Sequence, residues 1–598
     1  MNRTKAKAKY KWNVDKLYTK KRDFIEDLEL LSINMRAQTL FKGSLKNYED
    51  FCDFDELSEQ GNLLSSKIEH FFKILEVEPH HKNALEFQAI YDKEMERFEG
   101  QFSWIEDEIK DIGKEQIFEW LDSKEIWKPY KRTYEKFFKN LKYLLPASDR
   151  ELLDKVSKSS GLIYEMYDSL KNKDNKTLTL NHKGNEYVLT QKNYIDYLEK
   201  SDPFLDQELR ALMVRKYHEK DLKNKFAFAK IYESIVKEET ETLKLIGMKN
   251  FEENFFGEEN ISVAAFKSLI DFASKNNEMY HEYFSLIKNH WGFNDKFYSS
   301  DSSLILYPEF LKKIDLNKSI LTIKESLNPL GEEYLRNLDE ALGDNKIDYF
   351  ESPTKSSGAF TTFSYEHGSL ISMNWSDNFS SMLTLTHELG HAVHNKFAKE
   401  NQPKPLNYFN NIIAEVASTL NEQIVINHWL KNTSSKQVKA NVLKERIEFI
   451  FNNFFHGIQE SYFEYECFKA IDKNESLTLE SIININKKTD KEIFGKSPFD
   501  KYDDKLKNIS WMLSSHIFEQ PFYLYKYALS LVMSFKLFQE FKNNNFELIT
   551  NFLKEGGNLE PLDLFKKYGV DITSQKSYEP LIDHLKELIE ELKECLEH

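Results

Sequence analysis

The chain has 598 residues, of which 82 are Lys or Arg and 98 are Asp or Glu, giving a formal net charge of −16. No segment concentrates the basic residues on one face, which argues against a nucleic-acid partner. No stretch approaches the roughly 18 apolar residues of a membrane span, and no apolar run follows the positively charged N-terminus, so we expect a cytoplasmic protein that does not contact a membrane.

Glycine and proline are scarce, with 19 and 13 residues, so turns and helix breaks should be few and the fold mainly α-helical. Up to about residue 170, apolar residues recur three and four positions apart, as at Ile68, Phe71 and Leu75. This spacing is typical of helices that bury one face. We therefore expect the chain to begin with an antiparallel array of helices.

A change of pattern after these helices indicates a β-hairpin near residues 177–190. Its two halves alternate in β-favouring side chains around a loop that contains Gly184. We place a domain boundary just after the hairpin. The expected division is an N-terminal helical region at 1–195 and a catalytic domain at 196–598.

Beyond residue 200 the pattern is again helical, until three short strands interrupt it. One helix has a good start at Ser262, whose hydroxyl can cap the apolar run that follows. The strands are expected at residues 348–350, 358–363 and 369–375, where Gly and Ser separate β-favouring residues. Helical patterning then resumes at residue 378 and continues to the end.

An HExxH motif, formed by His387, Glu388 and His391, lies in the first helix after these strands. Capping residues at 376–378 and an apolar stripe with helical spacing place the motif within that helix. Histidines four apart lie one above the other on one helical face, where their imidazoles can take adjacent corners of a tetrahedral zinc site. Glu388 follows the first ligand and can reach a water on the metal, so we expect it to be the general base.

A catalytic zinc needs a third protein ligand and an open position, so a carboxylate should lie on a helix downstream. The helix expected at 410–429 carries Glu415, which has apolar neighbours on both sides. A buried carboxylate is costly unless a cation compensates it, so Glu415 is the predicted third ligand. Glu422, two turns further on the same face, is either an acceptor for a ligand imidazole N–H or a surface glutamate. His394 is expected to be structural, since a fourth protein ligand would close the site.

Three runs in this order resemble the oligoendopeptidase F group of the thimet oligopeptidase and neurolysin family of zinc peptidases. They are HELGHAVH at 387–394, AEVASTLNE at 414–422 and HIFEQPFYLYKYALS at 516–530. The likeness covers much of the chain from about residue 200, whereas the first hundred residues carry no matching motif. It implies a mainly α, elongated, multi-helical zincin-type fold with a small β region next to the zinc helix. It also implies two parts that flank a deep channel, in which short peptides are cleaved.

The resemblance implies one Zn²⁺ per chain, held by His387, His391 and Glu415, with Glu388 as the base. The reasoning from the residues gives the same assignment. The prediction is therefore a zinc-dependent endopeptidase that hydrolyses internal bonds of short, unstructured oligopeptides with a metal-activated water.

The third run supplies candidate donors to the oxyanion, because a phenol or an imidazole donates a hydrogen bond without adding a permanent charge. Helical spacing puts Tyr523 and Tyr527 on one face with His516 and directs Tyr525 elsewhere. A gapless match to the family's histidine and tyrosines instead favours Tyr525. All four are kept as candidate catalytic residues, and the alternative is an aromatic stripe packed in the core.

Several alternatives stay open at this point. An exposed edge of the strands before the zinc helix could pair with a peptide backbone, or the strands could form an ordinary structural hairpin. The chain could be a catalytically silent helical binding protein with a structural zinc, although the intact Glu388 argues against it. It could also be a zinc carboxypeptidase or aminopeptidase, which would remove only terminal residues. The sequence leaves the oligomeric state undecided.

Overall fold

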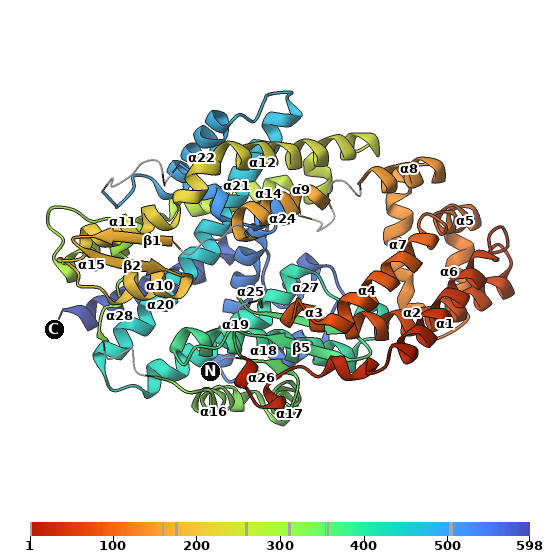
Figure 1. Ribbon diagram of the computed structural model, residues 1–598, viewed down its shortest axis with the longest axis horizontal. Coiled ribbons are helices and arrows are strands. Elements are labelled where there is room, and N and C mark those ends of the chain that lie inside the picture. Colours follow the sequence, from red (N-terminus) through yellow and green to blue (C-terminus); the bar gives the residue numbers. More distant parts are fainter. Residues whose placement is uncertain are drawn as a thin grey trace. The chain divides into compact units, whose positions relative to one another are not determined.

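The computed structural model of the protein describes residues 3–157, 161–173, 178–257, 261–308, 313–352, 354–355, 358–500, 506 and 508–597. The expected mainly α-helical architecture is confirmed, with two small sheets (Figure 1). Backbone contacts divide the chain into two compact units. Unit 1 comprises Met1–Val156, Lys313–Val425 and Leu537–Leu559, and unit 2 comprises Ser157–Lys312, Ile426–Lys536 and Glu560–His598. Both units are discontinuous in sequence, so the linear division after residue 195 stays a prediction.

Unit 1 begins with the expected array of helices. They are α1 (Lys21–Thr39), α2 (Tyr48–Phe72), α3 (Ile74–Val77), α4 (Lys82–Met95), α5 (Trp104–Ile112), α6 (Lys114–Asp122), α7 (Lys131–Asn140) and α8 (Ala147–Ser157). Of the apolar positions spaced three and four apart, Ile68 and Phe71 are buried and Leu75 is partly buried, and Phe24 stacks on Phe87 with ring centroids 4.6 Å apart. Leu370, from a strand far along the chain, belongs to the same core. The array is thus packed directly onto the sheet described next.

The sheet of unit 1 has the strand order β3-β5-β4. Strand β3 (Ile347–Asp348) is parallel to β5 (Gly368–Ser372), and β4 (Phe360–Ser364) is antiparallel to β5, with Phe360 opposite Ser372. The three strands predicted between residues 348 and 375 are therefore confirmed. The helices of this region are α16 (Leu316–Leu327), α17 (Glu332–Ala341), α18 (Phe379–Asn401), α19 (Asn411–Asn432) and α26 (Phe546–Lys554), of which α18 lies against β4 and β5 (Figure 1).

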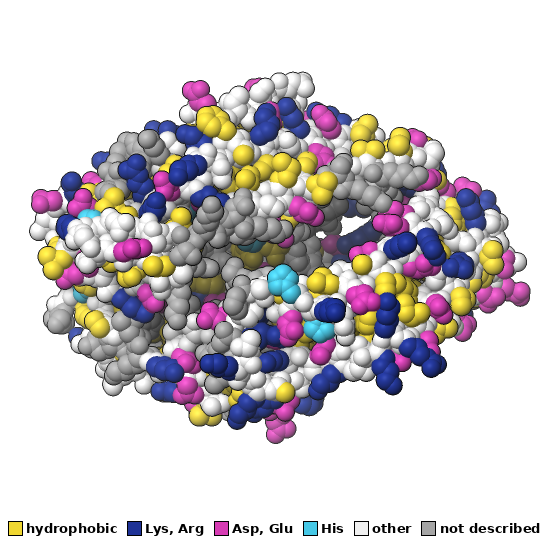
Figure 2. All heavy atoms as spheres, in the orientation of Figure 1, with side chains coloured by type: hydrophobic (Ala, Val, Ile, Leu, Met, Phe, Trp, Pro, Cys, Tyr) yellow, Lys and Arg dark blue, Asp and Glu magenta, His cyan; other side chains and the backbone are white. Residues whose placement is uncertain are grey.

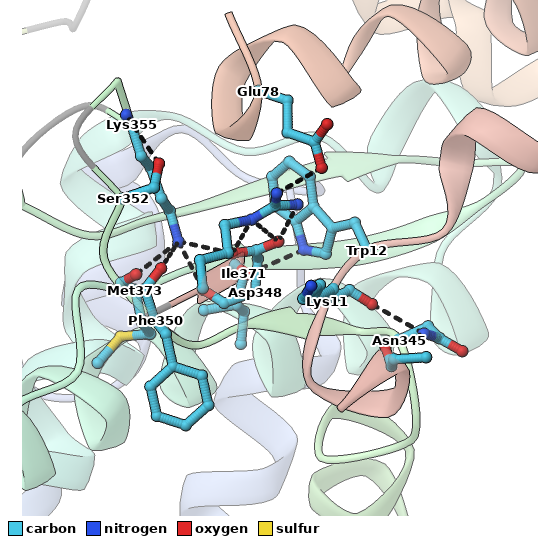
Figure 3. Close-up of polar contacts among 12 residues, drawn as sticks. Lys11, Trp12, Glu78, Asn345, Asp348, Phe350, Ser352, Lys355, Ile371 and Met373 are labelled. Carbon is cyan, nitrogen blue, oxygen red and sulfur yellow. Dashed lines mark hydrogen bonds and ion pairs between the residues drawn. The ribbon is translucent and has the colours of Figure 1, made fainter. Parts of the chain in front are cut away.

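The N-terminal segment, residues 3–18, lies along the β3 side of the sheet. The backbone N–H of Tyr349 donates to the carbonyl of Tyr10 at 3.2 Å. The buried indole of Trp12 donates to the carbonyl of Ile371 on β5 at 2.9 Å (Figure 3). With β3 covered in this way, β4 is the edge strand whose outer side carries no strand among the residues that the structure describes.

A buried ionic network fixes this segment to the sheet (Figure 3). Asp348, with no exposed surface, accepts hydrogen bonds from Nε of Arg3 at 2.9 Å and from Nζ of Lys355 at 2.8 Å. Arg3 also pairs with Glu78. The Lys355 ammonium reaches three backbone carbonyls as well, those of Asp348, Phe350 and Met373. Both cations thus pair with the carboxylate of Asp348, at the sheet that supports the edge strand.

Replacing Asp348 by Ala should lower the stability of unit 1 by about 3–5 kcal/mol, because removing one partner leaves buried charges uncompensated. The midpoint of chemical unfolding, followed by tryptophan fluorescence, checks this. The control is Asp344→Ala, since Asp344 is exposed in the preceding loop. Equal midpoints for the two variants would contradict the importance of the network.

Unit 2 contains the remaining helices and the hairpin. Its helices are α9 (Gly161–Asp168), α10 (Gln191–Lys200), α11 (Gln207–Tyr217), α12 (Glu219–Leu245), α13 (Phe251–Phe255), α14 (Val263–Lys275), α15 (Glu278–Trp291), α20 (Lys436–Ile450), α21 (Gly457–Asp472), α22 (Leu479–Phe494), α24 (His516–Glu519), most of α25 (Leu524–Lys542), α27 (Pro561–Lys567) and α28 (Glu579–Leu596). The predicted hairpin is confirmed as β1 (Leu178–His182) and β2 (Asn185–Leu189), while Thr177 lies outside the described residues. Ser262 caps α14 as expected, accepting from the N–H of Ala265 at 3.0 Å.

The surface mixes charges of opposite sign. On the face shown in Figure 2, Lys and Arg side chains are interspersed with Asp and Glu. Within the described part of the chain, no helix combines the length and the apolar character that crossing a membrane requires.

Candidate active site

Helix α18 presents the HExxH motif. The side chain of Asn378 caps its start by accepting from the N–H of Ser381 at 2.8 Å. One stripe of the helix is buried in the core, as the pattern predicted, and consists of Met382, Leu385, Leu389 and Val393. His387 and His391 occupy a half-buried face, where their Nε2 atoms lie 3.2 Å apart. The helical spacing therefore aims both imidazoles at one point.

Helix α19 brings a carboxylate to that point. The Oε2 atom of Glu415 lies 3.3 Å from Nε2 of His387 and 3.6 Å from Nε2 of His391. All three potential ligand atoms fall within 4.8 Å of one another. Glu415 is only 8% exposed, and the hydroxyl of Ser418 donates to its Oε2 at 2.9 Å, which orients the carboxylate. Two imidazoles and one carboxylate thus converge, as the sequence predicted.

Gly390 permits this approach of α19 to α18. A Cβ atom on Gly390 would lie 2.6 Å from Cα of Ser418 and 2.8 Å from the carbonyl oxygen of Ala417. Such distances are below van der Waals contact, and both partners are backbone atoms. The glycine between the two histidines therefore lets the backbone that carries Glu415 come close enough.

Replacing Gly390 by Ala should separate the two helices and weaken metal binding. A displacement of about 1 Å at a catalytic site can cost about 10²-fold in rate, so we expect kcat/KM to fall by that order together with metal content. Metal content by mass spectrometry and peptide turnover check this. Ser380→Ala, at an exposed position of the same helix, serves as the control. Full metal content and normal turnover in the Gly390 variant would contradict the tight approach.

The electrostatics of the site favour a cation. Burial alone would raise the pKa of Glu415, but the adjacent His391 and His387 lower it to about 2. Burial likewise disfavours the charged form of His387, yet Glu415 and Glu422 raise its pKa well above the ordinary value. The carboxylates around this imidazole therefore favour a positive charge at the site. A divalent cation would supply that positive charge, so the donor set fits a metal ion.

Glu422 and Thr361 each contact one residue of the candidate site. The carboxylate of Glu422, 6% exposed, lies 2.5 Å from Nδ1 of His387. Of the two interpretations from sequence, the surface position is wrong, because Glu422 is buried against the imidazole of His387; its role toward a metal ligand stays a prediction. Thr361 on β4 donates its hydroxyl to Oε2 of Glu388 at 2.6 Å, so the edge strand holds the predicted base.

His394 lies outside this cluster. It has no exposed surface and stacks on Phe409 with ring centroids 4.1 Å apart. Burial, with a smaller effect of His391, lowers its pKa to about 3, which keeps the ring neutral. This environment agrees with the structural role predicted for it.

The residues of the third sequence run lie in unit 2 and fall into two groups. His516, Tyr523 and Tyr527, which we call the His516 cluster, are half-buried and contact one another through their rings. The centroid of His516 is 5.5 Å from that of Tyr523 and 6.2 Å from that of Tyr527, and the two tyrosines are 5.3 Å apart. Tyr525 is 1% exposed and packs against Phe266. The grouping matches the helical-spacing argument, but its premise of one continuous helix is wrong, because α24 ends at Glu519 and α25 begins only at Leu524. The catalytic roles of all four residues stay predictions.

Sequence reasoning missed three residues that shape the candidate metal site: Thr361, Gly390 and Ser418. Two of them left a signal. A glycine in the middle of a helix usually has a packing reason, and Ser418 follows Glu415 by three positions on one helical face. Thr361 left none, because its partner Glu388 is 27 residues away and only the fold brings them together.

Comparison with known proteins agrees with this site. The family model described as peptidase family M3 matches residues 204–583, and one described as oligopeptidase F matches residues 108–176. The chain belongs to peptidase family M3. This family is metal-dependent, and the chain is a metalloendopeptidase. The resemblance seen in the three sequence runs is thereby confirmed.

Several known proteins are similar to this chain over nearly its whole length. Group B oligopeptidase PepB of Streptococcus agalactiae is 25% identical, covering 96% of this chain and 95% of its own. Oligopeptidase PepF of Bacillus subtilis is 24% identical, covering 100% and 88%. The crystal structure of oligoendopeptidase-F from Enterococcus faecium superposes with a TM-score of 0.73 at 20% identity, covering 96% of this chain and 99% of that one. The fold of that structure therefore matches this chain through the N-terminal region as well, where the sequence showed no motif.

Proposed function

We propose that this M3 peptidase is a zinc endopeptidase that cleaves internal bonds of short, unstructured oligopeptides. His387, His391 and Glu415 would hold one zinc ion, and Glu388 would be the general base. The observation that carries the proposal is the convergence of two imidazoles and a carboxylate within 4.8 Å, with Glu388 buried beside them.

The donor set favours zinc among the metals of proteins. Two histidines and one glutamate are the ligands of a catalytic zinc that keeps one position open, and the buried carboxylate of Glu422 orients one imidazole as such sites require. When bound, zinc would polarise the scissile carbonyl and make the attacking water more acidic.

The protein's own residues would manage the proton. Glu388 would take it from the attacking water and pass it to the amine that leaves, which requires its carboxylate to stay in one orientation. The hydrogen bond from Thr361, at 2.6 Å, provides that orientation. Because Thr361 lies on β4, the strand would link the substrate to the base if the peptide pairs with the strand's open edge.

The His516 cluster and Tyr525 are proposed to serve the oxyanion. Imidazole and phenol groups can donate to the developing negative charge without adding a permanent charge. His516, Tyr523 and Tyr527 are only half-buried, which supports them over the buried Tyr525. Each tyrosine is tested by Phe and His516 by Ala, with loss of one donor expected to lower kcat by about 10²-fold or more at normal zinc content.

The experiment that tests the function is digestion of a mixed peptide library, with the cut sites mapped by mass spectrometry, with and without a chelator. We expect internal cuts that the chelator abolishes and that zinc restores. Exclusive removal of terminal residues would indicate an exopeptidase instead. Absence of any cleavage by the zinc-loaded protein would favour a silent binding protein.

Substrate size is the second part of the test. If the site lies in a narrow channel, as the family resemblance implies, unfolded peptides should be cut and natively folded domains spared. The matched pair is one small domain in its folded form and in a destabilised, unfolded variant of the same sequence. Equal digestion of both forms would contradict the size limit.

A further inference from the structure

The chain just before α25 makes an unusual turn. Phe522 has a φ of +57°, in the left-handed region that bulky residues rarely adopt. Such a conformation persists only where the surroundings fix it, and it is often found at functional sites. The turn lies between His516, at the start of α24, and Tyr523, which stacks on it. Whatever holds Phe522 therefore also sets the geometry of the His516 cluster.

One face of α21 holds this turn through its backbone. Gly457, Ser461 and Glu464 are spaced by four and three residues, so they share a face of the helix. The carboxyl Oε1 of Glu464 accepts from the N–H of Phe522 at 3.0 Å. The hydroxyl of Ser461 accepts from the N–H of Tyr525 at 2.9 Å, which satisfies a donor in the first turn of α25.

The same face of α21 carries a glycine where the backbone of the turn packs against the helix. A Cβ atom on Gly457 would lie 2.8 Å from the carbonyl oxygen of Leu524, so the turn would have to move away from any larger residue. A neighbouring residue of α21, Glu460, accepts from the hydroxyl of Ser514 at 2.9 Å, two residues before His516. Helix α21 thus anchors the chain on both sides of the His516 cluster.

Glu464 is the unusual member of this face. It is 1% exposed, and its second oxygen, Oε2, has no hydrogen-bonding partner among the described residues. Burial raises the pKa of Glu464 well above its ordinary value; the hydrogen bond from the Phe522 N–H lowers it by less, and the nearby Glu460 adds to the rise, so the group is neutral. A carboxyl group buried in this way costs free energy that an apolar side chain of similar size would not.

On the two sides of the turn, the aromatic side chains of residues 516–527 fall into two groups. Phe522 packs in the core against Phe255 and Phe468, with ring centroids 4.8 and 5.2 Å away. Tyr525 is buried in the same core. Tyr523, between them, and Tyr527, after them, belong to the His516 cluster, so a change in the backbone at Phe522 would move that cluster.

We infer that Glu464 is a positioning residue for the peptidase reaction, which it serves by fixing the turn at Phe522 that presents the His516 cluster. The inference rests on the proposed role of that cluster in the zinc peptidase reaction. The acceptor oxygen, and not a negative charge, is what the turn needs from Glu464.

The test compares two variants that differ in this acceptor. Glu464→Gln keeps a neutral side chain of the same shape with a carbonyl oxygen for the Phe522 N–H, whereas Glu464→Leu removes the acceptor. We expect kcat of the Leu variant to fall by about 10²-fold, as for a misplaced catalytic group, while KM and zinc content stay near normal. The Gln variant should keep kcat within about threefold of the parent enzyme, since the geometry is retained.

The control is Glu466→Leu on the same helix, where the half-buried carboxylate forms an ion pair with Lys488. Hydrogen exchange gives a readout that does not depend on activity: the amide of Phe522 should exchange faster in Glu464→Leu and at the normal rate in Glu464→Gln. If Glu464→Leu does not fold, Ser461→Ala provides the second test, with a smaller loss of kcat and faster exchange at Tyr525.

A folded, zinc-loaded Glu464→Leu enzyme with the parent kcat would overturn the inference. So would an equal loss of kcat in the Gln and Leu variants, because the Gln side chain retains the acceptor. Glu388→Gln is assayed in parallel. If that variant keeps full turnover, the proposed mechanism fails, whereas loss of turnover there with normal kcat in Glu464→Leu refutes only the positioning role.

Discussion

Glu388→Gln should lower kcat by about 10²- to 10⁴-fold, because the amide cannot accept the proton of the attacking water. The substitution keeps the size of the side chain and leaves the two imidazoles and Glu415 in place, so about one zinc ion per chain should remain bound. The hydroxyl of Thr361 can still donate to the amide oxygen, so the side chain should stay oriented. Turnover of an internally quenched peptide and zinc content by mass spectrometry measure the two effects separately.

The matched control for this variant is Glu400→Gln, on the same helix. Glu400 pairs with Arg336 at 3.4 Å on the surface, away from the ligand face, so its charge should not affect turnover. Normal kcat in Glu388→Gln would exclude Glu388 as the base. Loss of zinc together with activity would instead show that Glu388 serves the metal site structurally.

Glu415→Ala should lose more zinc affinity than any change around the ligands. Removing an outer partner such as Glu422 typically costs about 10- to 100-fold in metal affinity, so loss of a ligand should exceed about 100-fold. The two imidazoles that remain cannot complete the site. Competition with a fluorescent zinc chelator gives the affinities of the parent, Glu415→Ala and Glu422→Gln proteins in one series.

The order within that series is the decisive result. We expect the parent to bind zinc most tightly, Glu422→Gln less so and Glu415→Ala least. Full zinc occupancy in Glu415→Ala would remove this residue from the ligand set. Helical content, measured by circular dichroism, should be equal in all three proteins, since the metal cluster involves only the facing surfaces of α18 and α19.

The sequence predicted the elements around the candidate metal site well, because the patterns that indicate them are local. Histidines four apart, a capping residue at Asn378 and a glutamate between apolar neighbours each depend on a single helix. The short strands before α18 were also found, since glycine and serine mark their ends. The prediction that α18 and α19 lie together came from zinc chemistry and not from a sequence pattern. In the structure, Gly390 is the residue that allows the two helices to come this close.

Other features were beyond reach of the sequence because they depend on contacts between distant residues. Arg3 and Asp348 are 345 positions apart, and nothing near either residue predicts the pair. The N-terminal helices share a core with Leu370, which a linear division of the chain after residue 195 does not anticipate. In the sequence, nothing distinguishes Glu464 from other glutamates in helices, because its partner is the backbone of Phe522, 58 residues away.

The buried pairing of Arg3 with Asp348 has a consequence for synthesis of the protein. Arg3 is synthesised 345 residues before its partner Asp348. Helix α26, which packs on α18 in the same unit, is translated later still. Unit 1 therefore cannot reach its native state vectorially, from the N-terminus onward. The emerging helices would expose apolar faces for that time, and a chaperone that shields them should raise the yield of active enzyme.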